Sequence, residues 1–141
     1  MLLLSIRPDF AEQILDGSKQ VEFRRRHPRR IELGSRMLIY ASSPTRALIG
    51  TAEVFDVVEA SPAEVWHEFN DVGGIEQEVY NAYYEASDRA VALRLRKPIR
   101  FDTAISLADL RCKLPGFHPP QQFAYLSAER LMKITRAIEC A

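Results

Sequence analysis

Pro8 and Gly17, which fit the start and the end of a helix, constrain the fold of this chain more than any other feature. The segment before them, Leu-Leu-Leu-Ser-Ile (2–6), is apolar and suits a strand. Between them, apolar residues recur at four-residue spacing, Pro8 fits the first turn of a helix, and Gly17 fits its C-cap. Segment 19–25 then alternates between apolar and polar residues, as a half-buried strand does. The chain therefore begins with a strand, a short helix and a second strand.

Three further extended segments follow. They cover 36–42, 46–60 and 89–101, and the first two are separated by a Ser-Ser-Pro turn. Gly50, inside the longest segment, marks a point where that strand can bulge or bend. The last segment alternates apolar residues with arginines, which predicts a strand with one basic face.

Two helices are predicted between the last two of these strands. The first covers 61–69 and begins with Ser-Pro-Ala-Glu, a capping box with proline at the first helical position. The second covers 75–86, and four-residue spacing predicts an apolar face formed by Ile75, Val79 and Tyr83.

The C-terminal part contains shorter elements. A helical turn is predicted at 106–110, a proline-rich loop entering a short element at 115–126, and a closing segment at 127–138. No repeat, low-complexity tract or linker divides the chain, so residues 1–141 are interpreted as a single domain. The predicted class is α+β, with a curled or barrel-like sheet of about five to six strands and short flanking helices.

Charged residues are unevenly distributed, although Lys and Arg together equal Asp and Glu at 19 each. Residues 1–46 hold nine Lys or Arg and five acids, 47–88 hold ten acids and no Lys or Arg, and 89–141 hold ten Lys or Arg and four acids. Acidic helices pairing with basic strands would give one neutral surface. A dipolar molecule with a basic face for an anionic partner is the alternative. The sequence leaves both open.

Several classes of protein and site are not expected. Arg7 and Pro8 interrupt the apolar start, so neither a signal peptide nor a membrane span is predicted. Cys112 and Cys140 lack metal-ligand spacing and are expected to be reduced thiols, as in a cytoplasmic protein. The three histidines are far apart, and no glycine-rich phosphate loop is present. We therefore expect no metal and no cofactor.

A sequence signature lies between the first helix and the second strand. Residues 17–24 read Gly-x-Lys-x-x-Glu-x-Arg, with Lys19, Glu22 and Arg24 at the fixed polar positions. This pattern, with its strand, helix and following strand, resembles the ASCH domain family over most of the chain, as a small stand-alone member of the bacterial or archaeal type. The resemblance implies a PUA-like β-barrel with short flanking helices and a cleft lined by the signature.

The resemblance also implies a choice of functions. Members of the family are thought to bind RNA or other nucleic acid, and some small bacterial members are amidohydrolases acting on an acetylated cytidine nucleoside. In those members, catalysis is attributed to a lysine, a threonine and a glutamate. The lysine corresponds to Lys19, but Glu22 occupies the position of the threonine, so the same mechanism does not carry over directly.

The chemistry of the signature can be argued from the residues themselves. Alternation along a strand places Glu22, Arg24 and Arg26 on one face, with Lys19 at the mouth of the strand. Arginine offers a planar fork for a phosphate or a base edge, and glutamate accepts from exocyclic amines. This arrangement predicts a polar cleft for a nucleotide, in which Glu22 orients Arg24. An ordinary surface ion pair is the alternative.

The remaining candidate residues surround this predicted centre. The arginine-rich stretch 25–30 contains a proline and is expected to be a loop that contacts phosphates. Tyr40 is one of four aromatics that could stack on a base, the others being Phe117, Phe123 and Tyr125, although most aromatics in a domain of this size are core. The predicted ligand-binding set comprises Arg7, Gly17, Lys19, Glu22, Arg24, Arg26, Arg29, Arg30, Tyr40 and Ser42.

Three functions remain open, with binding of RNA or a nucleotide favoured. The second is hydrolysis of a modified nucleoside, such as N4-acetylcytidine, in which Lys19 or Glu22 serves as a general base on water. The third is a nucleotide-sensing regulatory module, or a protein partner docked on the acidic stretch 47–88 with its Trp66 and tyrosines. The sequence does not determine the oligomeric state.

Overall fold

The computed structural model describes residues 1–140, and it describes side chains as far as residue 136. Six strands and five helices follow one another along the chain. Their bounds are β1 Leu2–Ile6, α1 Pro8–Asp16, β2 Val21–Arg24, β3 Ser35–Ala41, β4 Ala47–Ala60, α2 Pro62–Phe69, α3 Gln77–Tyr83, β5 Ala90–Ser106, α4 Leu107–Lys113, β6 Phe123–Tyr125 and α5 Ala128–Cys140.

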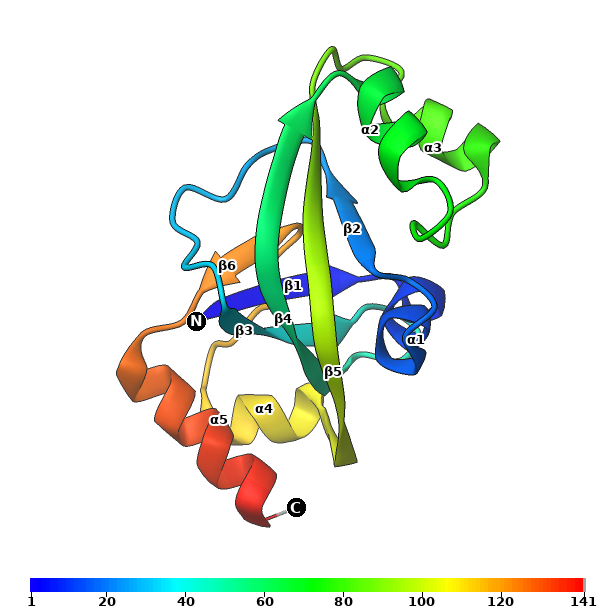
Figure 1. Ribbon diagram of the computed structural model, residues 1–141. Helices are drawn as coiled ribbons and strands as arrows, with labels where there is room; N and C mark the ends of the chain where they lie inside the picture. Colours follow the sequence, from blue (N-terminus) through cyan, green and yellow to red (C-terminus); the bar gives the residue numbers. More distant parts are fainter. Residues whose placement is uncertain (141) are drawn as a thin grey trace.

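All six strands form one mixed sheet with the order β2-β5-β4-β3-β1-β6. β1 runs parallel to β3, and every other neighbouring pair is antiparallel. The long strands β4 and β5 cross over β1 and β3, so that the sheet curls into a half-barrel (Figure 1). β2 and β6 are the two edges of this sheet. The predicted α+β class with a PUA-like barrel of five to six strands is confirmed.

The predicted opening of strand, helix and strand is also confirmed. Pro8 begins α1, and Gly17 caps it with φ 88°, a left-handed conformation that glycine adopts without a Cβ clash. The backbone N–H of Gly17 donates to the Ile14 carbonyl oxygen. The cap reverses the chain, so that Lys19 follows the turn at the entrance to β2.

The strands β4 and β5 pair along most of their lengths, with several shifts in register. One shift falls beside Gly50, as the sequence predicts. A Cβ at Gly50 would overlap the Ile99 carbonyl oxygen and lie 2.8 Å from Cδ2 of Leu15. Glycine is therefore required here because the partner strand and α1 approach the backbone too closely for any side chain.

Charges on β4 and β5 pair with each other. Glu53 Oε2 lies 2.7 Å from Arg96 Nε, and Asp56 Oδ2 lies 3.3 Å from Arg94 Nη1. Partly exposed pairs of this kind contribute about 0–1 kcal/mol, so they do not drive folding. The pairs nevertheless bring the acids of β4 close to the arginines of β5, so that their charges neutralise each other. These pairs join two strands, whereas the sequence interpretation paired acidic helices with basic strands, so that interpretation stays a prediction.

Three apolar clusters hold the elements together. The largest lies inside the half-barrel, where residues of β1, β3, β4 and β5 pack against Ala11 and Ile14 of α1. A second joins the sheet to α4 and α5 through residues such as Leu110 and Ile134. The third packs α2 and α3 against β2 and the beginning of β5. Figure 1 shows α2 and α3 together at one end of the molecule, with α4 and α5 at the other.

The two helices between β4 and β5 form as predicted, but one presents a different face to the core. α2 begins at the expected cap, where the Ser61 hydroxyl accepts from the Glu64 backbone N–H at 3.2 Å. In α3, however, Tyr80 is the buried residue and Val79 is 43% exposed. The predicted apolar face of Ile75, Val79 and Tyr83 is therefore not the core face. The core face carries Tyr80, followed by Tyr84.

The C-terminal elements complete the fold. The predicted helical turn at 106–110 extends to α4, the proline-rich loop leads into β6, and most of the closing segment is the helix α5. The Cys112 thiol is free and exposed, whereas the side chain of Cys140 lies outside the described residues. Within residues 1–140, no helix is both long enough and apolar enough to span a membrane.

Candidate nucleic-acid interface

Lys19, Glu22 and Arg24 meet in one pocket of about 200 Å³. We call it the signature pocket. Its other walls are the end of β1 with Ser5, the start of α1 with Phe10, and an apolar wall from the α3 region formed by Ile75, Val79 and Tyr83. The three signature side chains are nearly inaccessible to solvent, with exposed fractions of 2%, 6% and 7% in chain order. An ordinary surface ion pair is therefore excluded.

Lys19 is held inside the protein rather than at its surface. Its Nζ donates to the Gly73 carbonyl oxygen and lies 4.9 Å and 5.1 Å from the ring centroids of Phe10 and Phe23. Burial lowers the pKa of the Lys19 ammonium, and the nearby Glu22 carboxylate opposes this shift only in part. The amine is thus closer to its neutral form than a surface lysine would be.

Arg24 is oriented mainly by backbone carbonyls, not by Glu22 as the sequence predicted. Its Nη2 donates to the Ser5 carbonyl oxygen at 2.9 Å, and its Nη1 donates to that of Gln122 at 3.4 Å. The nearest contact with Glu22 joins Nε to Oε1 at 3.9 Å, which is too long for a hydrogen bond. The carboxylate is therefore left with hydrogen-bonding capacity that Arg24 does not use.

Three buried polar atoms around this pocket have no hydrogen-bond partner among the described residues. They are the Ser5 hydroxyl oxygen, Glu22 Oε2 and Arg24 Nε. An unsatisfied buried polar group lowers the stability of the folded state by about 1–3 kcal/mol. The three atoms are therefore destabilising unless another group forms hydrogen bonds with them. A ligand that both donates and accepts hydrogen bonds along one edge would do so.

The α3 region covers the signature from the side opposite α1. The Tyr84 hydroxyl donates to the Arg24 carbonyl oxygen at 2.7 Å, which fastens the helix end to the edge strand β2. The Arg25 guanidinium lies 4.1 Å from the Tyr83 ring centroid, and burial raises the pKa of the Tyr83 phenol. Tyr83 is thus a wall of the pocket. The sequence did not reveal this role, because the four-residue spacing of Tyr83 is typical of a core residue in a helix.

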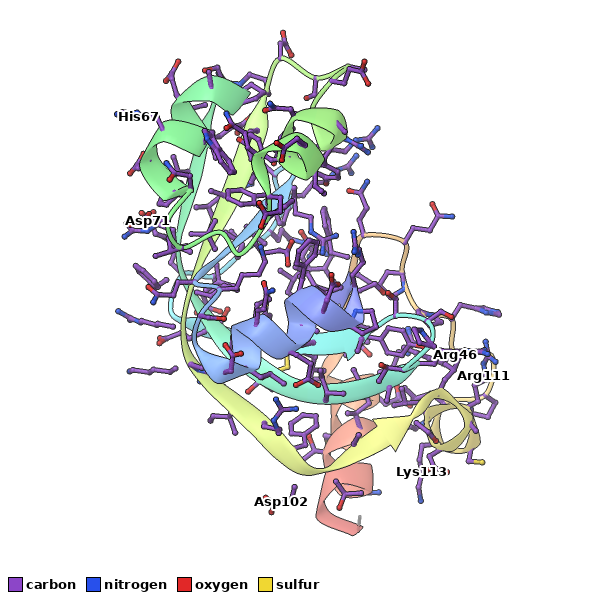
Figure 2. The ribbon with its side chains drawn as sticks, turned by 90° about the vertical axis from the view of Figure 1, so that its right-hand side faces the viewer. Arg46, His67, Asp71, Asp102, Arg111 and Lys113 are labelled. Atoms are coloured by element: carbon purple, nitrogen blue, oxygen red, sulfur yellow. The ribbon has the colours of Figure 1, made fainter. Side chains whose placement is uncertain are left out.

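A second pocket, of about 450 Å³, adjoins the first and shares Ser5 and Arg7 with it. We call it the arginine pocket, because Arg46 and Arg111 line it together with Arg7 and no carboxylate does. Figure 2 shows Arg46 and Arg111 beside each other, next to α4. Arg7 pairs with Asp9 at 3.0 Å, but no ion pair between described residues involves Arg46 or Arg111. Positive charge is therefore uncompensated here.

Hydroxyl and amide groups complete the arginine pocket. Tyr40 and Ser42 line it, and so does Gln121 from the proline-rich loop. The sequence predicted Tyr40 and Ser42 around the signature cleft, and the structure places them in the pocket that adjoins it. Tyr40 is the β3 partner of Ser5 on β1, the strand whose end lies between the two pockets.

Other predicted site residues are also distributed differently from the prediction. Gly17 caps α1 and lines a separate small pocket with Gln20 and Leu95, so it has a conformational role outside the signature pocket. Arg26 is exposed in the loop after β2 and lines neither the signature pocket nor the arginine pocket. The predicted grouping of Arg26 with Glu22 and Arg24 fails because β2 ends at Arg24, and strand alternation ends with it.

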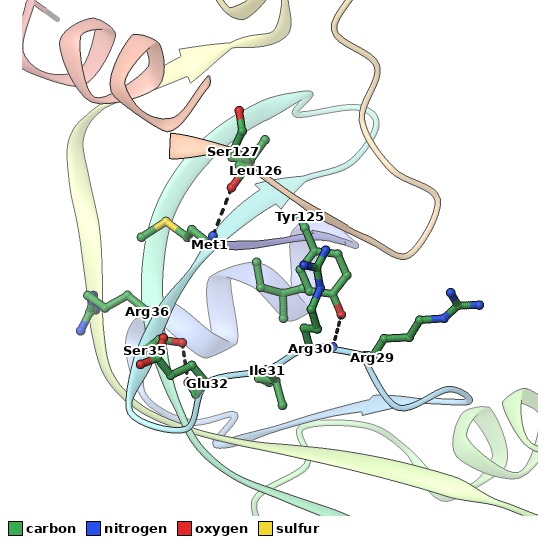
Figure 3. A pocket seen from close by; sticks show the side chains of 11 residues that line it. Met1, Arg29, Arg30, Ile31, Glu32, Ser35, Arg36, Tyr125, Leu126 and Ser127 are labelled. Carbon is green, nitrogen blue, oxygen red and sulfur yellow. Dashed lines mark hydrogen bonds between the residues drawn. The ribbon is translucent and has the colours of Figure 1, made fainter. Parts of the chain in front are cut away.

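Arg29 and Arg30 line a third pocket, of about 890 Å³, between the loop after β2 and the end of β6 (Figure 3). We call it the loop pocket. Tyr125 forms one wall, and its hydroxyl accepts from the Arg30 backbone N–H at 2.9 Å. Of the other proposed stacking residues, Phe117 is buried in the core and Phe123 packs against it, as the core interpretation predicts.

The sequence interpretation missed Arg46, Arg111 and Ser5 altogether. Arg46 follows the Ser-Ser-Pro-Thr turn and Arg111 lies in the last turn of α4, where a basic residue has an ordinary explanation. No local pattern marks them as partners, because their proximity arises from the tertiary fold. Among the described residues, no three His, Cys, Asp or Glu side chains are placed to hold a metal ion.

Comparison with known proteins agrees with this geometry. The model of the ASCH domain matches residues 4–99, which include the second half of β1, the signature and most of the sheet. The chain belongs to the ASCH domain family. An ASCH domain-containing ribonuclease of Zymomonas mobilis is 34% identical over 134 residues, covering 94% of this chain and 88% of that protein. The crystal structure of ASCH from Zymomonas mobilis matches with a TM-score of 0.90 and 31% identity, over 96% of this chain and 93% of that one.

Similarity also extends to more distant proteins. The large ribosomal subunit protein uL22 of Ureaplasma parvum is 28% identical over 109 residues, but the match spans only 34% of that protein. The N-terminal domain of McrB from Staphylothermus marinus has a TM-score of 0.55 at 14% identity, which shows a shared fold alone. The comparisons thus show the ASCH family and fold for this chain, and the word ribonuclease belongs to the name of the Zymomonas relative.

Proposed function

We propose that this ASCH domain binds single-stranded RNA, with one base in the signature pocket and an adjoining phosphate in the arginine pocket. The observation that carries the proposal is the contact between the two pockets through Ser5 and Arg7. One pocket has unsatisfied donors and an unsatisfied acceptor, and the other has arginines without carboxylates. A nucleotide presents the complementary groups at adjacent positions.

The signature pocket suits a base edge. Its volume of about 200 Å³ is below the range of roughly 300–1,000 Å³ that is typical for drug-sized ligands, so a single ring system is the appropriate size. Glu22 Oε2 accepts from an exocyclic amine, while Arg24 Nε and the Ser5 hydroxyl donate to a ring nitrogen or carbonyl. Phe10 and Tyr83 supply aromatic walls.

The arginine pocket suits a phosphate. Arginine forks bind phosphate oxygens bidentately, and such contacts provide affinity without reading sequence. Ser42 and Tyr40 add hydroxyl donors to Arg46 and Arg111. The similarity to an ASCH domain-containing ribonuclease supports RNA, rather than a free nucleotide, as the source of both groups.

Cleavage of the bound RNA is the second candidate function, and the same relative favours it. Arginines that hold a phosphate also stabilise the charge that develops on it during displacement. Tyr40, which is 2% exposed and lines the pocket, is the candidate for proton transfer. Loss of RNA cleavage in Tyr40→Phe, with RNA binding retained, supports this function. Equal cleavage by Tyr40→Phe and the unaltered protein excludes that role for Tyr40.

Hydrolysis of an acetylated cytidine nucleoside has one supporting observation, the lowered pKa of Lys19 beside Glu22. A neutral amine can accept a proton from water, so that water attacks in place of the absent threonine hydroxyl. Release of free cytidine that disappears in both Lys19→Met and Glu22→Gln supports this alternative. No release by the unaltered protein removes it.

Binding is tested by fluorescence anisotropy with labelled single-stranded RNA at about 50 mM salt. Glu22→Gln keeps the size of the side chain but converts an acceptor into a donor, and we expect it to weaken binding about tenfold. Arg46→Ala removes a phosphate contact and is expected to weaken binding of every RNA sequence to a similar degree.

Matched controls separate the site from general charge effects. Glu129→Gln changes an exposed carboxylate on α5, and Arg89→Ala changes an exposed arginine paired with Glu59. Neither control should alter RNA affinity. Retention of full affinity in both Glu22→Gln and Arg46→Ala contradicts the proposal, as does a failure of the unaltered protein to bind RNA.

Three further predictions accompany the proposal. Nucleotide sensing without RNA binding would appear as a thermal shift with a mononucleotide alone. A protein partner on segment 47–88 stays a prediction, although Trp66 and the tyrosines of this segment belong to or pack against a core cluster. A cytoplasmic setting is likewise expected from the sequence.

A further inference from the structure

The half-barrel has an open side between its two edge strands. β2 forms a hydrogen-bonded ladder only with β5, and β6 forms one only with β1. The loop 25–34 continues from β2 along this open side and reaches the end of β6. We call this open side the seam.

Individual contacts, not a strand ladder, bridge the seam. Arg24 donates from β2 to the carbonyl oxygens of Ser5 and Gln122, at the beginning of β6. At the other end of β6, the Arg30 backbone N–H donates to the Tyr125 hydroxyl. The signature pocket lies beside the first bridge and the loop pocket lies beside the second. The seam therefore connects the two pockets.

The loop pocket has the chemistry of a nucleotide subsite. Arg29, Arg30 and Arg36 line it against a single carboxylate, that of Glu32. The Arg30 guanidinium carbon lies 5.3 Å from the centroid of the Tyr125 ring, and Figure 3 shows the two side chains next to each other while Arg29 extends away from them. A stacked arginine and tyrosine offer a planar surface to a base, and Arg29 offers charge to a phosphate. The guanidinium of Arg36 donates instead to Thr51 Oγ1 and to the Lys97 carbonyl oxygen.

The distance between the sites suits a continuous strand of RNA. Leu2 lines the loop pocket, and Ser5 lines both the signature pocket and the arginine pocket. Both residues lie on β1, three positions apart, which corresponds to roughly 10 Å. The pocket of about 890 Å³ is large enough for a whole nucleotide. An oligonucleotide of a few residues can thus occupy all three pockets without a conformational change in the protein.

We propose that the loop pocket is a second subsite for single-stranded RNA, in which Arg29 contacts a phosphate and a base stacks against Arg30 and Tyr125. The RNA strand then follows the seam from the signature pocket to the loop pocket. This inference rests on the proposed function. An acidic peptide is the competing occupant, but it provides no ring for the stacked pair of side chains.

The test compares labelled RNA ligands of two lengths, a mononucleotide, which is too short to reach from the signature pocket to the loop pocket, and a single strand of about ten nucleotides. The double variant R29A/R30A removes two charges and the stacking guanidinium from the loop pocket. We expect it to weaken binding of the longer RNA at least about fivefold and to leave binding of the mononucleotide unchanged. The control R89A/K133A removes the same charge from exposed positions that line none of the three pockets, and it should change neither.

Each outcome bears on a different part of the proposal. An equal loss of affinity for both lengths, or no loss for the longer RNA, overturns the second subsite and leaves the signature pocket in place. Absence of RNA binding by the unaltered protein overturns both proposals. Competition by polyglutamate as strong as that by unlabelled RNA overturns RNA as the occupant.

Discussion

Arg24 Nη2 donates to the Ser5 carbonyl oxygen at 2.9 Å, and this contact joins the edge strand β2 to the end of β1 across the open side of the half-barrel. The same guanidinium reaches Gln122 next to β6, while its Nε stays unsatisfied toward the signature pocket. One side chain therefore stabilises the fold and offers a donor to a ligand.

The first prediction concerns this dual role. Arg24→Ala should lower the free energy of unfolding by about 2–3 kcal/mol, because it removes charge-assisted hydrogen bonds and leaves Glu22 buried without a positive neighbour at that position. Urea denaturation measures the change. Arg26→Ala, two residues later and exposed, should stay within about 0.5 kcal/mol of the unaltered protein. Equal effects of the two substitutions would contradict the structural role of Arg24.

A second prediction uses two adjacent tyrosines. The Tyr84 hydroxyl donates to the Arg24 carbonyl oxygen at 2.7 Å in a buried position, so Tyr84→Phe leaves that carbonyl unpaired and should cost about 1–2 kcal/mol. Tyr83→Phe is the matched control, because no described residue forms a hydrogen bond with its hydroxyl. Chemical denaturation of both variants, side by side, gives the comparison. A Tyr84→Phe protein as stable as Tyr83→Phe would show that this hydrogen bond does not hold the helix to β2.

The third prediction concerns the salt dependence of RNA binding. For single strands, the slope of the logarithm of the binding constant against the logarithm of salt concentration changes by about 0.7 for each phosphate contact. Arg46→Ala should therefore reduce the magnitude of this slope by about 0.7, and Arg111→Ala by a similar amount. Arg89→Ala should leave it unchanged, since Arg89 lines none of the three pockets. A slope unaffected by Arg46→Ala would place the phosphate elsewhere.

Local signals predicted the elements of the fold well. Pro8, Gly17 and Ser61 act on their own helix ends, so their effects are visible in a few neighbouring residues. Gly50 was likewise recognised as a place where a strand bends. The convergence of Lys19 and the following glutamate and arginine also came from short-range order, because one turn and one short strand carry them.

The predicted face of α3 was wrong because its sequence contains two apolar stripes. Ile75, Val79 and Tyr83 have four-residue spacing, and so do Tyr80 and Tyr84. Periodicity detects both stripes but does not determine which one faces β2. That choice depends on packing against Phe23, whose ring centroid lies 5.0 Å from that of Tyr80.

The arginine pocket could not be predicted for a different reason. Arg46 follows a turn, Arg111 lies on α4 and Gln121 lies in the proline-rich loop, so long stretches of sequence separate them. Each has an ordinary explanation in its local context. Their proximity exists only once the sheet order brings the ends of β1, β3 and β4 together.

The final prediction concerns the pH dependence of stability at Lys19. Burial lowers the pKa of Lys19 below the ordinary value of 10.5, so between the two pKa values the unfolded chain binds more protons than the folded one. The contribution of Lys19 to the free energy of unfolding should therefore rise as the pH increases through this window. It should be least favourable below the lowered pKa, where the charged amine is buried in full. Lys19→Met removes the titration while keeping a side chain of similar length.

The measurement is urea denaturation of the unaltered protein and of Lys19→Met from about pH 7 to about pH 10.5, so that the range ends at the ordinary pKa of lysine. The difference in free energy of unfolding, unaltered protein minus variant, should increase with pH. Shifts in the pKa of Tyr80 and Tyr84 are common to both proteins and cancel in the difference. Lys133→Met, at an exposed lysine on α5, is the control for replacing a lysine away from the pocket. Parallel pH curves for the unaltered protein and Lys19→Met would show that the pKa of Lys19 is not lowered, and general-base chemistry at this residue would lose its support.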